Sequence, residues 1–158
     1  MNKIQEKTNC IGTYAFYSID KKTRNKTLIC KKRNTITNVC LNVSALVFLG
    51  TFPTDNIVRY VALGTDNTTP TASDTTLGTE VHRSYYVANS NPSSGVVTID
   101  FYITTDDYSG TIEEVGIFGG NSATASADSG ILLSHVLWSY TKSSAEELLI
   151  QYTITFSQ

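Results

Sequence analysis

Short segments in which apolar and polar residues alternate recur along most of this 158-residue chain. Residues 96–104 read VVTIDFYIT and residues 148–156 read LLIQYTITF, so each would place apolar side chains mainly on one face of a strand. About eight such segments are separated by turn-forming residues, which is typical of the strands of a sandwich. We therefore predict an all-β fold, a two-sheet antiparallel β-sandwich of the jelly-roll or Ig-like kind.

One segment departs from this pattern and is predicted to form a short helix near residues 38–49. Thr37 can cap such a helix, although the β-branched residues that follow would also suit a strand. The apolar face of the helix would consist of Val39, Val43, Leu46 and Val47. The length of the chain suits a single domain. We divide this domain, 1–158, into an N-terminal arm (1–10), a basic hairpin (11–33) and a sandwich body (57–158).

A long polar segment, residues 64–80, follows a strand-like apolar segment. It is too polar to pack as a core element and too rich in turn-forming residues to be a linker. Asp74 can accept hydrogen bonds from backbone N–H groups downstream of it, and so cap a turn that brings Leu77 to the core. The sequence therefore predicts an ordered loop. Residues 119–130, GGNSATASADSG, are instead predicted to be a solvated connection between strands.

Four segments that span most of the chain carry a further signal. They are KKRNTIT (31–37), VALGTDNTTPTASDTTLGTEVHR (61–83), EEVGIF (113–118) and LIQYTITF (149–156). In these segments the chain resembles a family of virion structural proteins of tailed bacteriophages, associated with tails, tail fibres and necks. The resemblance implies a late, non-enzymatic virion protein that is assembled in the host cytoplasm. It also implies a homo-oligomer that docks to other virion proteins, with a host surface glycan as an additional candidate partner.

Pattern and resemblance together assign a structural role to four residues of these segments. Glu114 falls on the strand face opposite Val115 and Ile117, and Arg83 at the end of the long loop is its candidate ion-pair partner. A partly buried pair of this kind would pin the loop to the sandwich. The predicted loop-pinning residues are Asp74, Leu77, Arg83 and Glu114.

Charge is distributed unevenly along the chain. Residues 1–50 carry nine bases and two acids, a balance of +7, whereas residues 51–158 carry three bases and twelve acids, a balance of −9. This asymmetry predicts that one end of the molecule faces something negative, unless the bases only solvate a hairpin. The candidates are nucleic acid and the acidic body of a neighbouring copy or of another virion protein. No aromatic residues interleave with the bases at 20–33, which disfavours single-strand recognition, so a nucleic-acid partner is not expected. The candidate interface residues are Lys21, Lys22, Arg24, Lys26, Lys31, Lys32 and Arg33.

The usual residue patterns for catalysis and metal binding are missing from the sequence. His82 and His135 lack the spacing of a metal site, and the three cysteines, Cys10, Cys30 and Cys40, show no CxxC spacing. Adjacent acids point to opposite faces of a strand, so they do not form the carboxylate pair of a glycosidase. We therefore predict no catalytic residue, metal or cofactor, and we expect neither a membrane span nor a signal peptide.

Three alternatives to a tail, fibre or neck component remain open. The first is a head decoration protein. The second is a carbohydrate-binding adhesion module at a fibre tip, in which exposed tyrosines and Trp138 would stack on sugar, and the third is a polysaccharide depolymerase. Trp138 separates the second from a structural role, because its apolar neighbours in the sequence predict that it is buried.

Overall fold

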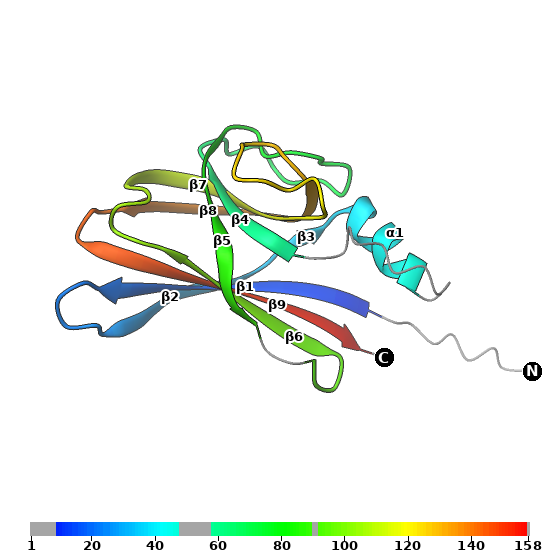
Figure 1. The fold of residues 1–158 in the computed structure, drawn as a ribbon, viewed down its shortest axis with the longest axis horizontal. Coiled ribbons are helices and arrows are strands. Elements are labelled where there is room, and N and C mark those ends of the chain that lie inside the picture. Colours follow the sequence, from blue (N-terminus) through cyan, green and yellow to red (C-terminus); the bar gives the residue numbers. More distant parts are fainter. Residues whose placement is uncertain (1–8, 48–57, 90–91, 158) are drawn as a thin grey trace, which may run out of the picture.

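A computed structural model describes residues 9–47, 58–89 and 92–157 of the chain (Figure 1). These residues form nine strands and one helix. They are β1 (Asn9–Asp20), β2 (Lys26–Arg33), β3 (Thr35–Ile36), α1 (Asn38–Val47), β4 (Val58–Gly64), β5 (Glu80–Asn89), β6 (Val96–Ile103), β7 (Gly110–Gly119), β8 (Ile131–Lys142) and β9 (Glu146–Ser157). The prediction of an all-β fold with one short helix is confirmed.

The strands form one antiparallel sheet in the order β2-β1-β9-β6-β5-β4-β7-β8-β3. The sheet bends at β5, which pairs with β4 as far as Tyr85 and with β6 from Tyr86 onward. The bend places β7 and β8 in one layer and β1 and β9 in the other (Figure 1). Two separate sheets, as in a sandwich, are not confirmed, because β5 is hydrogen bonded into both layers.

The two ends of the sheet come close to each other and nearly close it. β3 follows β2 after the single residue Asn34 and pairs with β8, through Thr35 opposite His135 and Ile36 opposite Ser134. The strands at the two ends of the sheet order are therefore neighbours along the chain. The remaining gap in the sheet lies between β2 and the part of β8 beyond His135.

The core lies between the two layers and is rich in aromatic side chains. Phe16 of β1 stacks on Trp138 of β8 with ring centroids 3.8 Å apart, and Trp138 stacks in turn on Tyr140 at 4.9 Å. Trp138 is only 2% exposed, so its predicted burial is confirmed. Its ring is therefore not available to stack on a sugar.

The helix α1 begins at the predicted cap. The backbone N–H of Cys40 donates to Thr37 Oγ1 at 3.2 Å, and the same hydroxyl donates to the Leu132 carbonyl at 2.7 Å. Cys40 and Val43 are buried, whereas Leu46 is 38% exposed, so the predicted apolar face is wrong at Leu46. The reason is that the helix packs through its Cys40–Val43 side. Residues 48 and 49 of the predicted helix lie outside the described residues.

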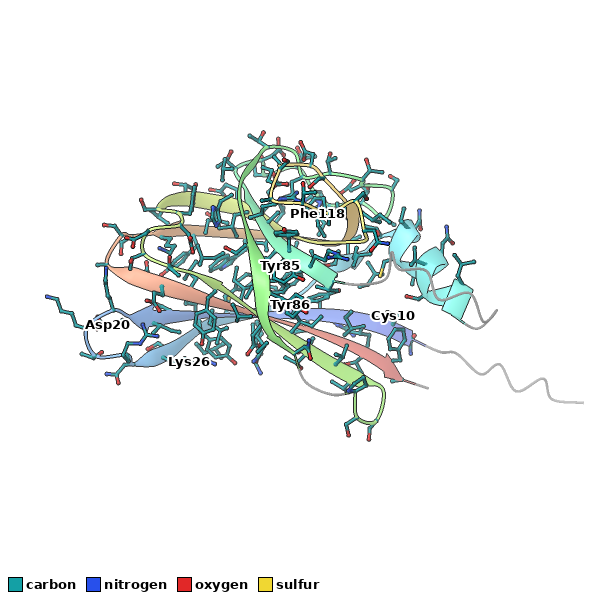
Figure 2. The ribbon with its side chains drawn as sticks, viewed as in Figure 1. Cys10, Asp20, Lys26, Tyr85, Tyr86 and Phe118 are labelled. Atoms are coloured by element: carbon teal, nitrogen blue, oxygen red, sulfur yellow. The ribbon has the colours of Figure 1, made fainter. Side chains whose placement is uncertain are left out.

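The predicted basic hairpin is formed by β1 and β2. Its turn is organised by Asp20, which Figure 2 shows at the tip of the hairpin. Asp20 Oδ1 accepts hydrogen bonds from the backbone N–H groups of Lys22 at 3.0 Å and Thr23 at 2.6 Å. Arg24 completes the turn in a left-handed conformation, with φ of 59°.

Candidate functional site

The long loop between β4 and β5 lies on the outer face of the layer that contains β7 and β8. Leu77, 4% exposed, packs there against Ala62, Phe118 and Leu132. Gly116 makes room for it, because a Cβ at this position would lie 2.9 Å from Leu77 Cδ2 and 2.8 Å from Leu132 Cδ1. The loop therefore contributes its own small apolar cluster on this face, separate from the core between the layers.

Glu114 holds the two ends of this loop together. Its carboxylate is 1% exposed and accepts hydrogen bonds from the backbone N–H groups of Asp66 (3.3 Å), Gly78 (3.0 Å) and Thr79 (2.9 Å). A Cβ at Gly64 would clash with Glu114 Oε1, so glycine is required beside it. Glu114 thus satisfies loop N–H groups that no strand pairs with.

His135 extends this arrangement to the middle of the loop. Its Nε2 lies 2.9 Å from Glu114 Oε2, and its Nδ1 lies 2.9 Å from Asp74 Oδ2. A neutral imidazole carries only one N–H, so it can donate to only one of the two carboxylates. Both contacts are hydrogen bonds only when a second proton is present, either on the ring or on one of the carboxylates. The pattern of the sequence did not predict this role, because His135 is distant from both carboxylates along the chain.

Asp74 caps a turn of the loop, but from the opposite direction to the one predicted. Its carboxylate accepts hydrogen bonds from the backbone N–H and the hydroxyl of Thr71, at 2.9 and 2.5 Å, so the capped groups lie upstream of it. Burial raises the pKa of Asp74, but the hydrogen bonds from Thr71 and His135 lower it by more, and the pKa is lowered overall. Asp74 therefore remains a carboxylate in moderately acidic solution.

The predicted pair between Arg83 and Glu114 is wrong, because Arg83 binds Glu80. The guanidinium contacts the carboxylate at 2.5 and 2.6 Å, and both side chains are almost fully buried. A register shift in the pairing of β4 with β5 inserts one extra residue in β5, which lets Glu80 and Arg83 face the same side. Such a bulge leaves no mark in the alternation of the sequence.

Arg83 pins a different loop, the connection between β7 and β8. Its Nη1 donates to the carbonyls of Thr124 (2.9 Å) and Ser129 (3.0 Å), and its guanidinium lies 4.7 Å from the ring of Phe118. Phe118 lies on the layer that the two loops cross (Figure 2). The segment 119–130, predicted to be only a solvated connection, is therefore fixed at this point by a buried ion pair.

The structure separates the predicted interface residues into two groups. Near the hairpin turn, Arg24 Nη1 lies 2.7 Å from Glu147 Oε2, Lys21 Nζ donates to Thr105 Oγ1, and Lys26 Nζ lies over a tyrosine ring. Part of the acidic partner surface that the charge pattern predicted thus belongs to the same chain. The second group is Lys31, Lys32 and Arg33, which we call the basic end of β2. All three side chains are exposed, and no carboxylate in the described part of the chain forms an ion pair with them.

A groove of about 440 Å³ lies beside the basic end of β2. It occupies the gap in the sheet, between the end of β2 and β8, under Pro70 of the long loop. Its lining residues are Lys32, Arg33, Asn34, Thr35, Pro70, His135, Val136 and Leu137. His135 thus contacts the loop on one side and reaches the groove on the other.

One pair of side chains approaches a catalytic arrangement. His82 Nε2 lies 3.0 Å from Ser84 Oγ, and burial lowers the pKa of His82, which keeps the ring neutral. A nucleophile of this kind also needs a group that orients the histidine. Among the described residues, no carboxylate is hydrogen bonded to the other ring nitrogen of His82, and no group of three or more His, Cys, Asp or Glu could hold a metal ion.

The remaining observations concern membranes and relatives. None of the helical segments in the described residues is long and apolar enough to cross a bilayer. Comparison of the chain with family models, with curated proteins and with solved structures found no match.

Proposed function

We propose that this chain is a structural, non-enzymatic component of a tailed-phage virion that acts by self-association and by docking to other virion proteins. The position that the resemblance favours is the tail, a tail fibre or the neck, and a head decoration protein is the alternative within the same class. Assembly takes place in the host cytoplasm. On this proposal the two layers of the bent sheet serve as the two faces of a β-sandwich.

The observation that carries this proposal is how the polar residues of the resembling segments are used. The side chains of Glu114, Glu80 and Arg83 are all buried. Glu80 and Arg83 bond to each other, and the remaining hydrogen bonds of the three residues go to loop backbone groups, to His135 and to the Ser129 hydroxyl. Residues that are fully engaged in this way hold loops in place and leave no reactive group exposed. The segments that carry the resemblance therefore encode a scaffold for two ordered loops, as a building block of an assembly requires.

The basic end of β2 supports association as the mode of action. Three adjacent cationic side chains lie on a strand at the edge of the sheet, whereas residues 51–158 carry a net charge of −9. Charged complementary surfaces accelerate and orient association, and they fix the register between subunits. The hairpin turn contributes less than the sequence suggested, because Arg24 already has an intramolecular partner.

A second candidate function, glycan binding, is favoured by one specific surface. A groove of about 400 Å³ on the outer face of the other layer is lined by Ala88, Asn89, Thr98, Asp100 and Gln151. Gln151 Nε2 donates to Asp100 Oδ1 at 2.9 Å, which leaves amide and carboxylate oxygens to accept bonds from sugar hydroxyl groups. Tyr85, at the centre of β5 in Figure 2, is 46% exposed and offers a ring on the molecular surface.

Electron microscopy of the purified protein tests the proposal. The expected result is rings, tubes or fibres built from regularly repeated subunits, whose symmetry identifies the position in the particle. A uniform population of single subunits over the full range of accessible protein concentrations would contradict a structural role through self-association.

A further inference from the structure

The groove beside the basic end of β2 is bounded by two strand edges. β2 is the first strand in the sheet order, so its outer side has no strand partner in the described part of the chain. β8 pairs with the two-residue strand β3 only at Ser134 and His135. Beyond His135, backbone N–H and C=O groups on this side of β8 are therefore open, as on any sheet edge.

The side chains at these edges select what can pair with them. Exposed lysines on an edge strand usually prevent unwanted strand pairing, because burying them next to a neutral strand costs desolvation energy. Lys32 and Arg33 line the groove, and neither has a carboxylate partner among the described residues. An incoming strand that supplies carboxylates turns this barrier into an attraction.

We propose that this groove binds an extended acidic segment of another virion protein, which pairs with an open strand edge and places its carboxylates against Lys32 and Arg33. This inference rests on the proposed function and names the partner of the docking surface. Addition of a strand to an exposed sheet edge is a common mode of peptide recognition, in which backbone hydrogen bonds supply affinity and side chains supply specificity. The bound segment would also fill the remaining gap in the sheet.

A polypeptide fits the groove better than a nucleic acid does. The groove offers open backbone donors and acceptors on strand edges, which match the backbone of a peptide. Single-stranded nucleic acids bind by stacking bases on aromatic rings as well as by phosphate contacts, and no Phe, Tyr or Trp lines this groove. The charge would attract either ligand, so the backbone of the ligand decides between them.

The probe for this inference is a short fluorescent peptide with an adjacent Glu–Glu pair flanked by valines, so that each face of the bound strand carries a carboxylate. It is added to the full-length protein, and binding is followed by fluorescence anisotropy. We expect saturable binding that weakens as salt is added, because exposed charges are screened. The double substitution Lys32→Glu/Arg33→Glu should weaken binding about tenfold or more. Both side chains are exposed, so the variant should fold, which its melting temperature verifies.

Three controls separate this binding mode from non-specific attraction. The double variant Lys21→Glu/Lys22→Glu has the same change in net charge at the hairpin turn and should bind the peptide as the unmodified protein does. The same peptide with an N-methyl group on every amide keeps its charge but cannot donate a backbone hydrogen bond from either edge, and it should not bind. A single-stranded oligonucleotide of equal charge should bind more weakly than the peptide.

The proposal is overturned if the peptide does not bind, if both double variants lose binding equally, or if the N-methylated peptide binds as well as the parent. Tighter binding of the oligonucleotide would overturn it in favour of a nucleic-acid partner. These outcomes are independent of self-association, which is measured without the peptide. Regular assemblies without peptide binding would leave the proposed structural role intact and remove only this inference.

Discussion

At the scale of single residues, Glu114 is the side chain of β7 that fixes both ends of the long loop. Its carboxylate, which is 1% exposed, accepts hydrogen bonds from three backbone N–H groups and also contacts His135. Each of those loop groups would lack a partner without it, and a buried unpaired N–H costs about 1–3 kcal/mol. The adjacent acid, Glu113, accepts only from the Ser139 hydroxyl at the surface.

Substitution of Glu114 by Gln tests this assignment with little change in shape. The amide keeps one acceptor oxygen but replaces the other with an NH2 donor that faces backbone N–H groups. We expect a loss of about 3–5 kcal/mol in the free energy of unfolding, as when one partner of a buried pair is removed. Denaturant melts measure it. Glu113→Gln is the matched control and should stay within about 0.5 kcal/mol; equal effects of the two substitutions would contradict the role of Glu114.

The lowered pKa of Asp74 predicts how the stability of the protein depends on pH. Its pKa is lowered in the folded protein, so its contribution to stability is fully present above the unfolded pKa of about 4. That contribution is lost as the pH falls through the lower folded value. In melts over a series of acidic pH values, Asp74→Asn should therefore lose less stability on acidification than the unmodified protein. An identical acid profile for the two proteins would show that Asp74 is not coupled to folding.

At the scale of elements, two ordered loops cover the outer face of one layer of the sheet. The loop of residues 65–79 is held by Glu114, His135 and Asp74, and the connection between β7 and β8 is held by Arg83 and Glu80. Figure 1 shows both loops on the same side of the molecule. This layer is therefore protected on both faces, by the core on one side and by the loops on the other.

Leu77 is the apolar anchor of the longer loop, and its truncation measures how firmly the loop is packed. Leu77→Ala should lower the free energy of unfolding by about 2–5 kcal/mol, since the loop is held at both ends and cannot collapse into the cavity. Thr69→Ala, at an exposed position of the same loop, should change it by less than about 0.5 kcal/mol. Small and equal effects in urea melts would show that the loop is a loose tether.

The elements that the sequence predicted are those whose signal is local. Alternation in 96–104 and 148–156 identified β6 and β9, and Thr37 identified the start of α1, because a strand period and a cap are properties of a few adjacent residues. The partner of Arg83 was not predictable, because a one-residue bulge in β5 decides it. Closure of the sheet was equally hidden, since it depends on where the single residue Asn34 directs the chain after β2.

At the scale of the whole molecule, an ion pair within the fold compensates part of the charge asymmetry along the sequence. Arg24 meets Glu147, so the hairpin turn is already paired with part of the acidic body. The basic end of β2 has no ion-pair partner among the described residues, and it lies beside the groove between β2 and β8. On the proposed function, association between copies and docking to other virion proteins both use this end of the strand, and not the hairpin turn.

Sedimentation velocity at low and high salt tests this central claim most directly. The unmodified protein should form assemblies at low salt that dissociate as salt screens the exposed charges. The triple variant Lys31→Glu/Lys32→Glu/Arg33→Glu should remain a single subunit under both conditions, whereas Lys21→Glu/Lys22→Glu should assemble like the unmodified protein. Assemblies of unchanged size and salt dependence in the triple variant would contradict the claim that this chain works by association through the basic end of β2.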